Sequence, residues 1–175
     1  YPPAVRITGL DLSPEQLAAN EYAHEKVVGD VQTWRTNRQW DAVVCVYLLE
    51  HVDDPGRAAA NLLSWTRPGG LLVLAVPNLH SLKGLVTRAT PFGFHHWFYR
   101  HVYRRPYAIF PTTMRPDIAP PRLRRRFAGE TIVHEAYGQE RFGRAVGLAY
   151  GAVVLALKAL SLGHWRPEDS NYLLV

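Results

Sequence analysis

The sequence predicts an α/β protein with a doubly wound, mostly parallel sheet. Strand-like apolar runs alternate with helix-like segments along the first half of the chain. The run DAVVCVYLL at 41–49 is continuous rather than alternating, which is typical of a central parallel strand covered on both faces. The chain has 175 residues, 47% of them hydrophobic, which is enough for one packed domain.

The first half divides into alternating elements. VRITGL at 5–10 predicts a strand that ends before Asp11, and Ser13 followed by Pro14 predicts the start of a helix reaching about residue 23. KVVGDV at 26–31 predicts a second strand, and 32–40 a loop or short helix. Asp54 and Pro55 predict the next helix, which RPGG at 67–70 ends, and LLVLAVPN at 71–78 predicts another buried strand.

The second half is less regular. Residues 80–121 form an aromatic, Arg-rich and Pro-rich insertion with no clear period. PRLRRRFAG at 121–129 then predicts a short helix, ETIVHEAYG a strand, 141–164 a long apolar helix, and SNYLLV a last strand. We therefore expect one domain with three parts: a ligand-binding part at 1–79, the insertion at 80–121 and a C-terminal part at 122–175.

Charge is concentrated in the insertion. Residues 1–82 have six basic and nine acidic side chains, residues 83–126 have ten and one, and residues 127–175 have four and five, which together give the net charge of +5. Such a block indicates either an anionic partner or a solvated face. The one cysteine, Cys45, lies in an apolar run, and the start YPPAVR lacks a signal-peptide profile. These features favour a cytoplasmic location.

Acidic residues follow two predicted strands. In open α/β sheets, ligands bind beyond the carboxyl ends of the strands. Asp11 ends the first strand, where a carboxylate can accept hydrogen bonds from two ribose hydroxyls; the alternative is a helix-capping or turn aspartate. Asp30 follows the second strand, where it could meet an adenine amino group, although Gly-Asp is also common in turns.

Three sequence blocks that follow one another along the chain are more specific than either aspartate alone. GLDLSPEQLAAN at 9–20, VYLLEHVDDP at 46–55 and TRPGGLLVLAVPN at 66–78 resemble the class I S-adenosylmethionine-dependent methyltransferases, and most of all the branch with "LEHV.DP" after the fourth strand and "VPN" after the fifth. The resemblance implies a Rossmann-like fold with S-adenosylmethionine as cofactor. It also implies cofactor roles for certain residues: Asp11 on the ribose, Leu12 beside the adenine, Asp30 and Val31 on the adenine, and Val46 and Tyr47 lining the cofactor. Leu12, Val31 and Val46 could equally be core residues.

One part of the family pattern is missing. The family's first strand ends in a GxGxG loop whose glycines let the backbone approach the cofactor, and none of the thirteen glycines here has that spacing. We therefore expect that the first strand, this loop and one or two helices are absent. We also expect that the chain as given binds S-adenosylmethionine weakly or not at all, whereas the intact protein binds it.

Methyl transfer to a hydroxyl needs a proton acceptor. His51 follows the predicted central strand beside Glu50 and is the candidate catalytic residue; the alternative is a loop histidine bonded to backbone. In quinone-biosynthesis O-methyltransferases of similar pattern, a Glu three residues before the Glu-His pair helps to bind a metal. Tyr47 stands at that position here, so we expect no metal site.

In the family that the three blocks resemble, insertions after the fifth strand commonly form the acceptor lid, so the resemblance implies that role for residues 80–121. His95, His96, Trp97, Tyr99 and Arg100 could form an aromatic, cationic pocket for an anionic or ring-bearing acceptor. The alternative is a nucleic-acid surface, which we rank lower because no RNA-binding module is recognisable.

The apolar run at 145–163 has Lys158 as its one charge. It predicts a helix that covers the sheet or the lid, lies on a membrane surface, or contacts a partner through Gly147 and Gly151. The resulting hypothesis is an S-adenosylmethionine-dependent methyltransferase that acts on a small-molecule or lipid-linked acceptor, on oxygen, and is cytoplasmic with possible peripheral membrane contact. The alternatives are a non-catalytic binding or scaffold module and a nucleic-acid methyltransferase.

Overall fold

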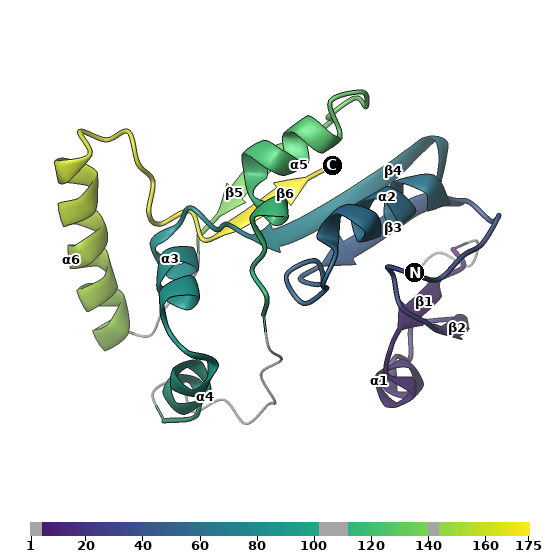
Figure 1. Ribbon diagram of the computed structural model, residues 1–175, viewed down its shortest axis with the longest axis horizontal. Helices are drawn as coiled ribbons and strands as arrows, with labels where there is room; N and C mark the ends of the chain where they lie inside the picture. The colour runs from purple at the N-terminus through teal and green to yellow at the C-terminus, as the bar shows by residue number, and fades with distance from the viewer. Residues whose placement is uncertain (1–4, 102–111, 140–143) are drawn as a thin grey trace.

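The structure is a computed structural model that describes residues 5–101, 112–139 and 144–175. It is a mixed α/β fold with two sheets (Figure 1). A two-stranded parallel sheet joins β1 (Thr8–Asp11) to β2 (Glu25–Val28). A four-stranded sheet has the order β3-β4-β6-β5 and contains β3 (Trp40–Val46), β4 (Thr66–Pro77), β5 (Glu135–Gly138) and β6 (Asn171–Leu174).

The pairing corrects the expected sheet in two respects. β3 and β4 are parallel, but β6 runs antiparallel to both β4 and β5, so parallel pairing is confined to β1–β2 and β3–β4. Within the described residues, β1 pairs only with β2 and β3 only with β4, so β3 is an edge strand rather than a central one. The fold class is α/β as predicted, but the single sheet is divided in two.

Helix starts follow the predicted local signals. α1 (Pro14–Ala19) begins where the Ser13 hydroxyl accepts from the Gln16 N–H at 3.1 Å, and it ends before residue 23 because the chain turns at Asn20. α2 (Pro55–Trp65) begins where the Asp54 carboxylate accepts from the Arg57 N–H at 2.8 Å. The remaining helical elements are α3 (Leu82–Ala89), α4 (Phe92–His101), η1 (Pro116–Ile118), α5 (Pro120–Arg126) and α6 (Arg144–Leu160).

One face of the four-stranded sheet is buried and the other is open. The buried face carries Cys45, Leu74 and Val76, and the core against it is built from α2, η1 and α5. Burial raises the pKa of the Cys45 thiol to about 12, in keeping with a space-filling role. Val44 and Val46 on the opposite face are 64% and 51% exposed. The prediction that β3 is covered on both faces is therefore wrong for the described residues, among which no helix packs on that side.

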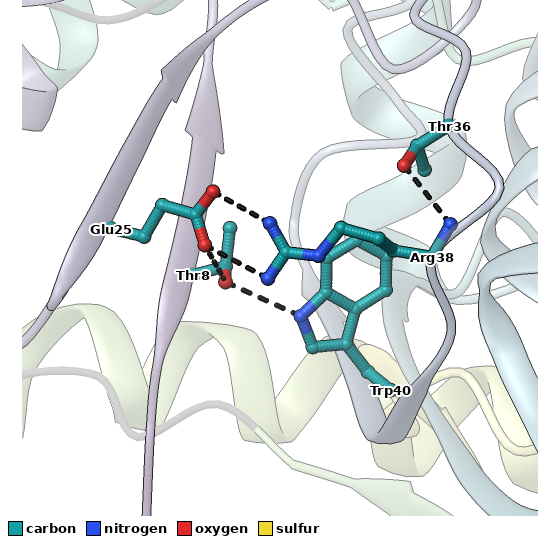
Figure 2. Close-up of polar contacts among 5 residues, drawn as sticks. All are labelled: Thr8, Glu25, Thr36, Arg38 and Trp40. Carbon is teal, nitrogen blue, oxygen red and sulfur yellow. Dashed lines mark hydrogen bonds and ion pairs between the residues drawn. The ribbon is translucent and has the colours of Figure 1, made fainter.

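Side chains at the amino ends of the strands join the two sheets (Figure 2). The Trp40 indole at the start of β3 donates to the Thr8 hydroxyl at the start of β1 at 3.3 Å. Thr8 donates in turn to Glu25, which accepts two hydrogen bonds from Arg38 at 2.7 and 2.9 Å. The Arg38 guanidinium lies 5.1 Å from the Trp40 ring centroid, a distance at which the cation is attracted to the ring. This cluster fixes β1 beside β3.

Candidate functional site

The carboxyl ends of β1, β2 and β3 lie at one edge of the molecule. β1 and β2 are parallel, with Asp11 opposite Val28. A groove of about 150 Å³ separates β1 from β3, and its lining runs from Thr8 and Trp40 at the amino ends to Leu10 and Leu48 at the other. The two strands therefore run in the same direction, and the residues that follow them reach the same edge.

Asp11 is half-buried at this edge and already makes a turn. One of its carboxylate oxygens accepts from the Ser13 N–H at 2.8 Å, and its carbonyl accepts from the Gly29 N–H at 2.9 Å. The turn-aspartate alternative is thus present in the structure. It is compatible with ligand binding, because an ionised carboxylate has about four acceptor positions and the turn uses one of them. The Ser13 bond also orients the carboxylate.

Asp30 is tied to the start of α2. Its carboxylate accepts from the Gln32 backbone N–H at 2.8 Å and from the Gln32 side-chain amide at 3.1 Å. The Gln32 amide oxygen accepts in turn from the Asp54 N–H at 2.8 Å. Asn61 of α2 donates to the Val31 carbonyl at 2.7 Å. These bonds hold the β2 end of the site against α2.

The apolar candidates divide into exposed and buried side chains. Leu12, Val46 and Tyr47 are exposed at the edge, whereas the Val31 side chain packs in the core. Tyr47 has φ of 51°, a left-handed conformation that is uncommon outside glycine, while its N–H donates to the Ala75 carbonyl at 2.8 Å. Such backbone strain is concentrated at functional sites in proteins. It ends β3 and turns the chain toward Glu50 and His51.

Glu50 and His51 lie next to each other beside the edge. A carboxyl oxygen of Glu50 lies 4.0 Å from His51 Nε2, and the Glu50 side chain is 4% exposed whereas that of His51 is 28% exposed. The other carboxyl oxygen of Glu50 has no hydrogen-bond partner among the described residues. Burial raises the pKa of Glu50, while its backbone hydrogen bond, His51 and Lys83 act in the opposite direction. His51 is therefore accessible and has an electrostatic partner.

A later part of the insertion, at Thr113, is fixed to the same loop. The Thr113 N–H and hydroxyl donate to the Glu50 carbonyl at 2.8 and 3.1 Å, and the hydroxyl also lies 3.2 Å from the Val52 carbonyl. Met114 follows in the core. The insertion thus returns to the site beside His51, a connection that the sequence did not reveal because Thr113 and Glu50 are 63 residues apart.

The acceptor candidates lie on α4, a helix that the sequence did not assign. The Trp97 side chain is 52% exposed and stacks between Phe94 and His101, with ring centroids 6.1 and 5.5 Å apart. Arg100 is exposed. His95, His96 and Tyr99 belong to α4, but their side chains lie outside the described part of the structure. A pocket made by all five candidates stays a prediction.

Sequence reasoning missed the structural roles of two polar residues, Asn78 and Ser81. Asn78, just past β4, is buried, donates to the Asp169 carbonyl at 2.8 Å, and accepts from the His80 N–H at 3.0 Å. Ser81 then starts α3 by accepting from the Gly84 N–H at 3.0 Å. Both residues closely follow the apolar run of β4, and a serine near the start of a helix is a common cap. A search for polar residues just past each predicted strand would have found them.

Neither a metal cluster nor a membrane span is found where the structure describes the chain. No group of three or more His, Cys, Asp or Glu side chains there is placed to share a metal ion. None of the helices within the described ranges has the length and apolar content that a membrane span requires. The absence of a metal site in the working protein stays a prediction.

Comparison with known sequences gives a family match. The sequence profile of the family described as "Methyltransferase domain" matches residues 2–115. The ubiquinone biosynthesis O-methyltransferase of Aeromonas salmonicida (strain A449) is 27% identical over 81 residues, which cover 41% of this chain and 34% of the relative. The match thus spans about a third of the curated relative's length.

Solved structures share the fold at low identity. A methyltransferase solved with the Haloferax volcanii Trm112 methyltransferase activator has a TM-score of 0.58 at 18% identity, covering 97% of this chain and 69% of that one. A SAM-dependent methyltransferase from Archaeoglobus fulgidus has a TM-score of 0.55 at 14% identity, covering 95% and 73%. The [4+2]-cyclase SpnF has a TM-score of 0.53 at 15% identity, covering 98% and 66%. These likenesses establish a Rossmann-like methyltransferase fold.

Proposed function

We propose, from the membership of this chain in the methyltransferase domain family, that the protein transfers a methyl group from S-adenosylmethionine to a small-molecule or lipid-linked acceptor, on an oxygen atom. S-adenosylmethionine is the family's methyl donor, so the chain is a methyltransferase domain with that cofactor. The observation that supports the proposal most is the shared edge of β1, β2 and β3, where carboxylates and exposed apolar side chains come together.

The residues at this edge fit a nucleoside. Asp11 would accept hydrogen bonds from the ribose hydroxyls while Ser13 holds it in place, and Leu12 would cover one side of the adenine. Asp30 would accept from the adenine amino group, and Val31 would contact the ring through its backbone because its side chain is in the core. The exposed side chains of Val46 and Tyr47 would line the remaining wall.

The groove between β1 and β3 is where we propose that an additional strand lies. The edges of the two strands face each other across a groove of about 150 Å³ that is lined largely by apolar side chains. An additional parallel strand between them would pair with both edges and would carry the expected glycine loop to the carboxyl edge, beside Asp11. This is why we expect the chain as given to bind the cofactor weakly and the full-length protein to bind it.

His51 is the proposed proton acceptor. The cofactor supplies an electrophilic methyl group on a sulfonium, so the protein has to align the acceptor, exclude water and remove a proton from a hydroxyl. His51 is accessible beside Tyr47, and the Glu50 carboxyl lies 4.0 Å from its Nε2. Thr113 fixes a later part of the insertion to the Glu50 carbonyl, in the same loop as His51. Trp97 and Arg100 would contact the acceptor.

Equilibrium binding of S-adenosylhomocysteine tests the cofactor part of the proposal. We expect binding by the full-length protein and weak or no binding by residues 1–175. Tight binding by the shorter chain would contradict the need for an additional strand and glycine loop. Mass spectrometry of the purified full-length protein would add whether S-adenosylhomocysteine is retained from the cell.

Two other functions have specific support. A non-catalytic binding or scaffold module is favoured by the lack of GxGxG spacing, and the likeness to a cyclase shows that this fold is not limited to methyl transfer. A GxGxG sequence upstream would favour the enzyme. A nucleic-acid methyltransferase is favoured by the ten basic side chains at 83–126. This function predicts RNA or DNA binding that weakens steeply with salt.

A cytoplasmic location is also part of the main proposal.

A further inference from the structure

Three helices gather on the side of the molecule away from the two-stranded sheet. α3, α4 and α6 lie together at the left of Figure 1, and β1 and β2 lie at the right. Two contacts hold α6 to the segment that follows it: the Tyr150 hydroxyl donates to the Pro167 carbonyl at 3.2 Å, and Lys158 pairs with Glu168 at 2.6 Å. The Leu82 N–H at the start of α3 donates to the same Pro167 carbonyl at 2.8 Å. α3 and α6 are thus joined through one short segment.

The exposed face of α6, within residues 147–160, is apolar. Leu148, Leu155 and Leu160 are 71–82% exposed, and Leu162 in the following turn is 85% exposed. A single exposed leucine is ordinary, but a continuous apolar helix surface indicates an interaction site. Between residues 145 and 160 the one charged side chain is Lys158, and it forms an ion pair with Glu168. Over this range, an apolar partner would therefore meet no uncompensated charge; the first residue of α6, Arg144, is basic.

The exposed charged side chains described on and beside these three helices are basic. α3, α4 and α6 contain no Asp or Glu, whereas Arg88, Arg100 and Arg166 are exposed on or beside them. A second copy of the chain would bring like charges together on docking, which costs free energy. A partner with an apolar interior beneath an anionic polar layer would satisfy both the leucines and the arginines.

We propose that α6 lies in the plane of an anionic phospholipid bilayer, with Leu148, Leu155, Leu160 and Leu162 in the boundary between headgroups and acyl chains. The arginines of α3 and α4 then lie at the headgroup level. This placement deepens the proposed function, on which it rests for the class of acceptor: a lipid-linked hydroxyl would reach α4 and His51 along the membrane surface.

Vesicle co-sedimentation of the full-length protein tests the surface. The vesicles are phosphatidylcholine with and without phosphatidylglycerol. We expect binding to the anionic vesicles, and at least a tenfold loss of the partition coefficient for Leu155→Asp or Leu160→Asp, on the order of the burial of one leucine side chain. Arg88→Gln and Arg100→Gln should each weaken binding to anionic vesicles by about fivefold, the equivalent of about 1 kcal/mol per basic residue.

Val133→Asp is the matched control. Val133 is 67% exposed in the loop before β5, and its N–H donates to the Val175 carbonyl, so it has similar exposure away from α6. It should leave vesicle binding unchanged. Circular dichroism confirms that each variant is folded, and S-adenosylhomocysteine binding is measured separately. Vesicle binding without cofactor binding would contradict only the proposed function and leave the membrane surface supported.

Three results would overturn the membrane proposal. The first is no binding of the wild-type protein to anionic vesicles. The second is an equal loss in Val133→Asp and Leu155→Asp, which would remove α6 as the contact. The third is light scattering that shows a dimer in solution which Leu155→Asp dissociates, because α6 would then be covered by a second copy.

Discussion

Replacing Gly84 with alanine should destabilise the protein, although the same change usually stabilises a helix. Gly84 lies in α3, and a Cβ built on it would clash with the Asn78 carbonyl oxygen and lie 2.9 Å from the Leu79 backbone. These are backbone atoms, which do not rotate away. The Asn78 carbonyl is also held by the Ser81 hydroxyl at 2.7 Å and by the Ser81 N–H at 3.1 Å. The start of α3 would have to move off the end of β4.

The magnitude follows from two opposing contributions. Glycine to alanine in a helix interior gains about 1 kcal/mol from backbone entropy. Overpacking of a buried position costs about 1–3 kcal/mol, and the upper half of that range applies where backbone atoms are struck. Gly84→Ala should therefore lower the free energy of unfolding by about 1–2 kcal/mol. For a domain of this size, that corresponds to a decrease in Tm of roughly 2–8 °C.

Gly151→Ala on α6 provides the matched control. A Cβ there would meet no atom within 4 Å, so the helix gain is unopposed and the free energy of unfolding should rise by up to about 1 kcal/mol. Thermal and urea denaturation of both variants measure the difference in sign. If Gly84→Ala were as stable as Gly151→Ala, the close packing of α3 on the end of β4 would be refuted.

Three further changes test other parts of the structure. Asp54→Ala should lower the free energy of unfolding by about 1 kcal/mol because it removes the cap of α2, whereas Asp53→Ala next to it should have little effect; urea denaturation compares them. Burial raises the pKa of Glu50, so its contribution to stability is complete below the ordinary carboxyl pKa and is lost as pH rises through the raised value. The Tm of Glu50→Gln minus the Tm of the wild type should therefore increase as pH rises. Curves of Tm against pH that run parallel for the two proteins would contradict this. Trp40→Phe removes the hydrogen bond to Thr8 and should lower the free energy of unfolding by about 1 kcal/mol. A decrease of about 3 kcal/mol or more would show that the Trp40 ring stabilises the protein mainly through packing.

Local signals in the sequence predicted where α1 and α2 begin. Ser13 and Asp54 precede prolines, and each side chain caps its helix as expected, because a cap depends on residues only three apart. α4 was not predicted because aromatic and basic residues alternate in it without a helical period. The capping rule that worked for α1 and α2 also applies to α3, which Ser81 caps, but the sequence of α4 offers no such cap or period.

Long-range features were harder to predict. The continuous run at 41–49 predicted a strand buried on both sides, but Val44 and Val46 are exposed because no described helix packs on that face. Cover on a strand depends on segments elsewhere in the chain, which a local pattern does not contain. The burial of Glu50 and its link to Thr113 are of the same kind, since 63 residues separate the two partners.

The candidate cofactor residues were predicted from position and resemblance, and the structure places them at the expected strand ends. The structure adds the contacts that three of them already make: Asp11 accepts from the Ser13 N–H, Asp30 accepts from Gln32, and Val31 packs in the core. These roles could not be deduced from the sequence, because an aspartate after a strand is equally suited to a turn and to a ligand. A ligand-binding role therefore requires a measurement.

Isothermal titration calorimetry of S-adenosylhomocysteine against the full-length protein tests the central claim most directly. Asp11→Asn keeps an oxygen for the Ser13 N–H but removes the charge, and Asp41→Asn is the control at the exposed start of β3. Loss of charged hydrogen bonds worth about 1.5–3 kcal/mol predicts roughly 10- to 150-fold weaker binding for Asp11→Asn and wild-type affinity for Asp41→Asn. Wild-type affinity in Asp11→Asn would contradict a ribose site at the end of β1.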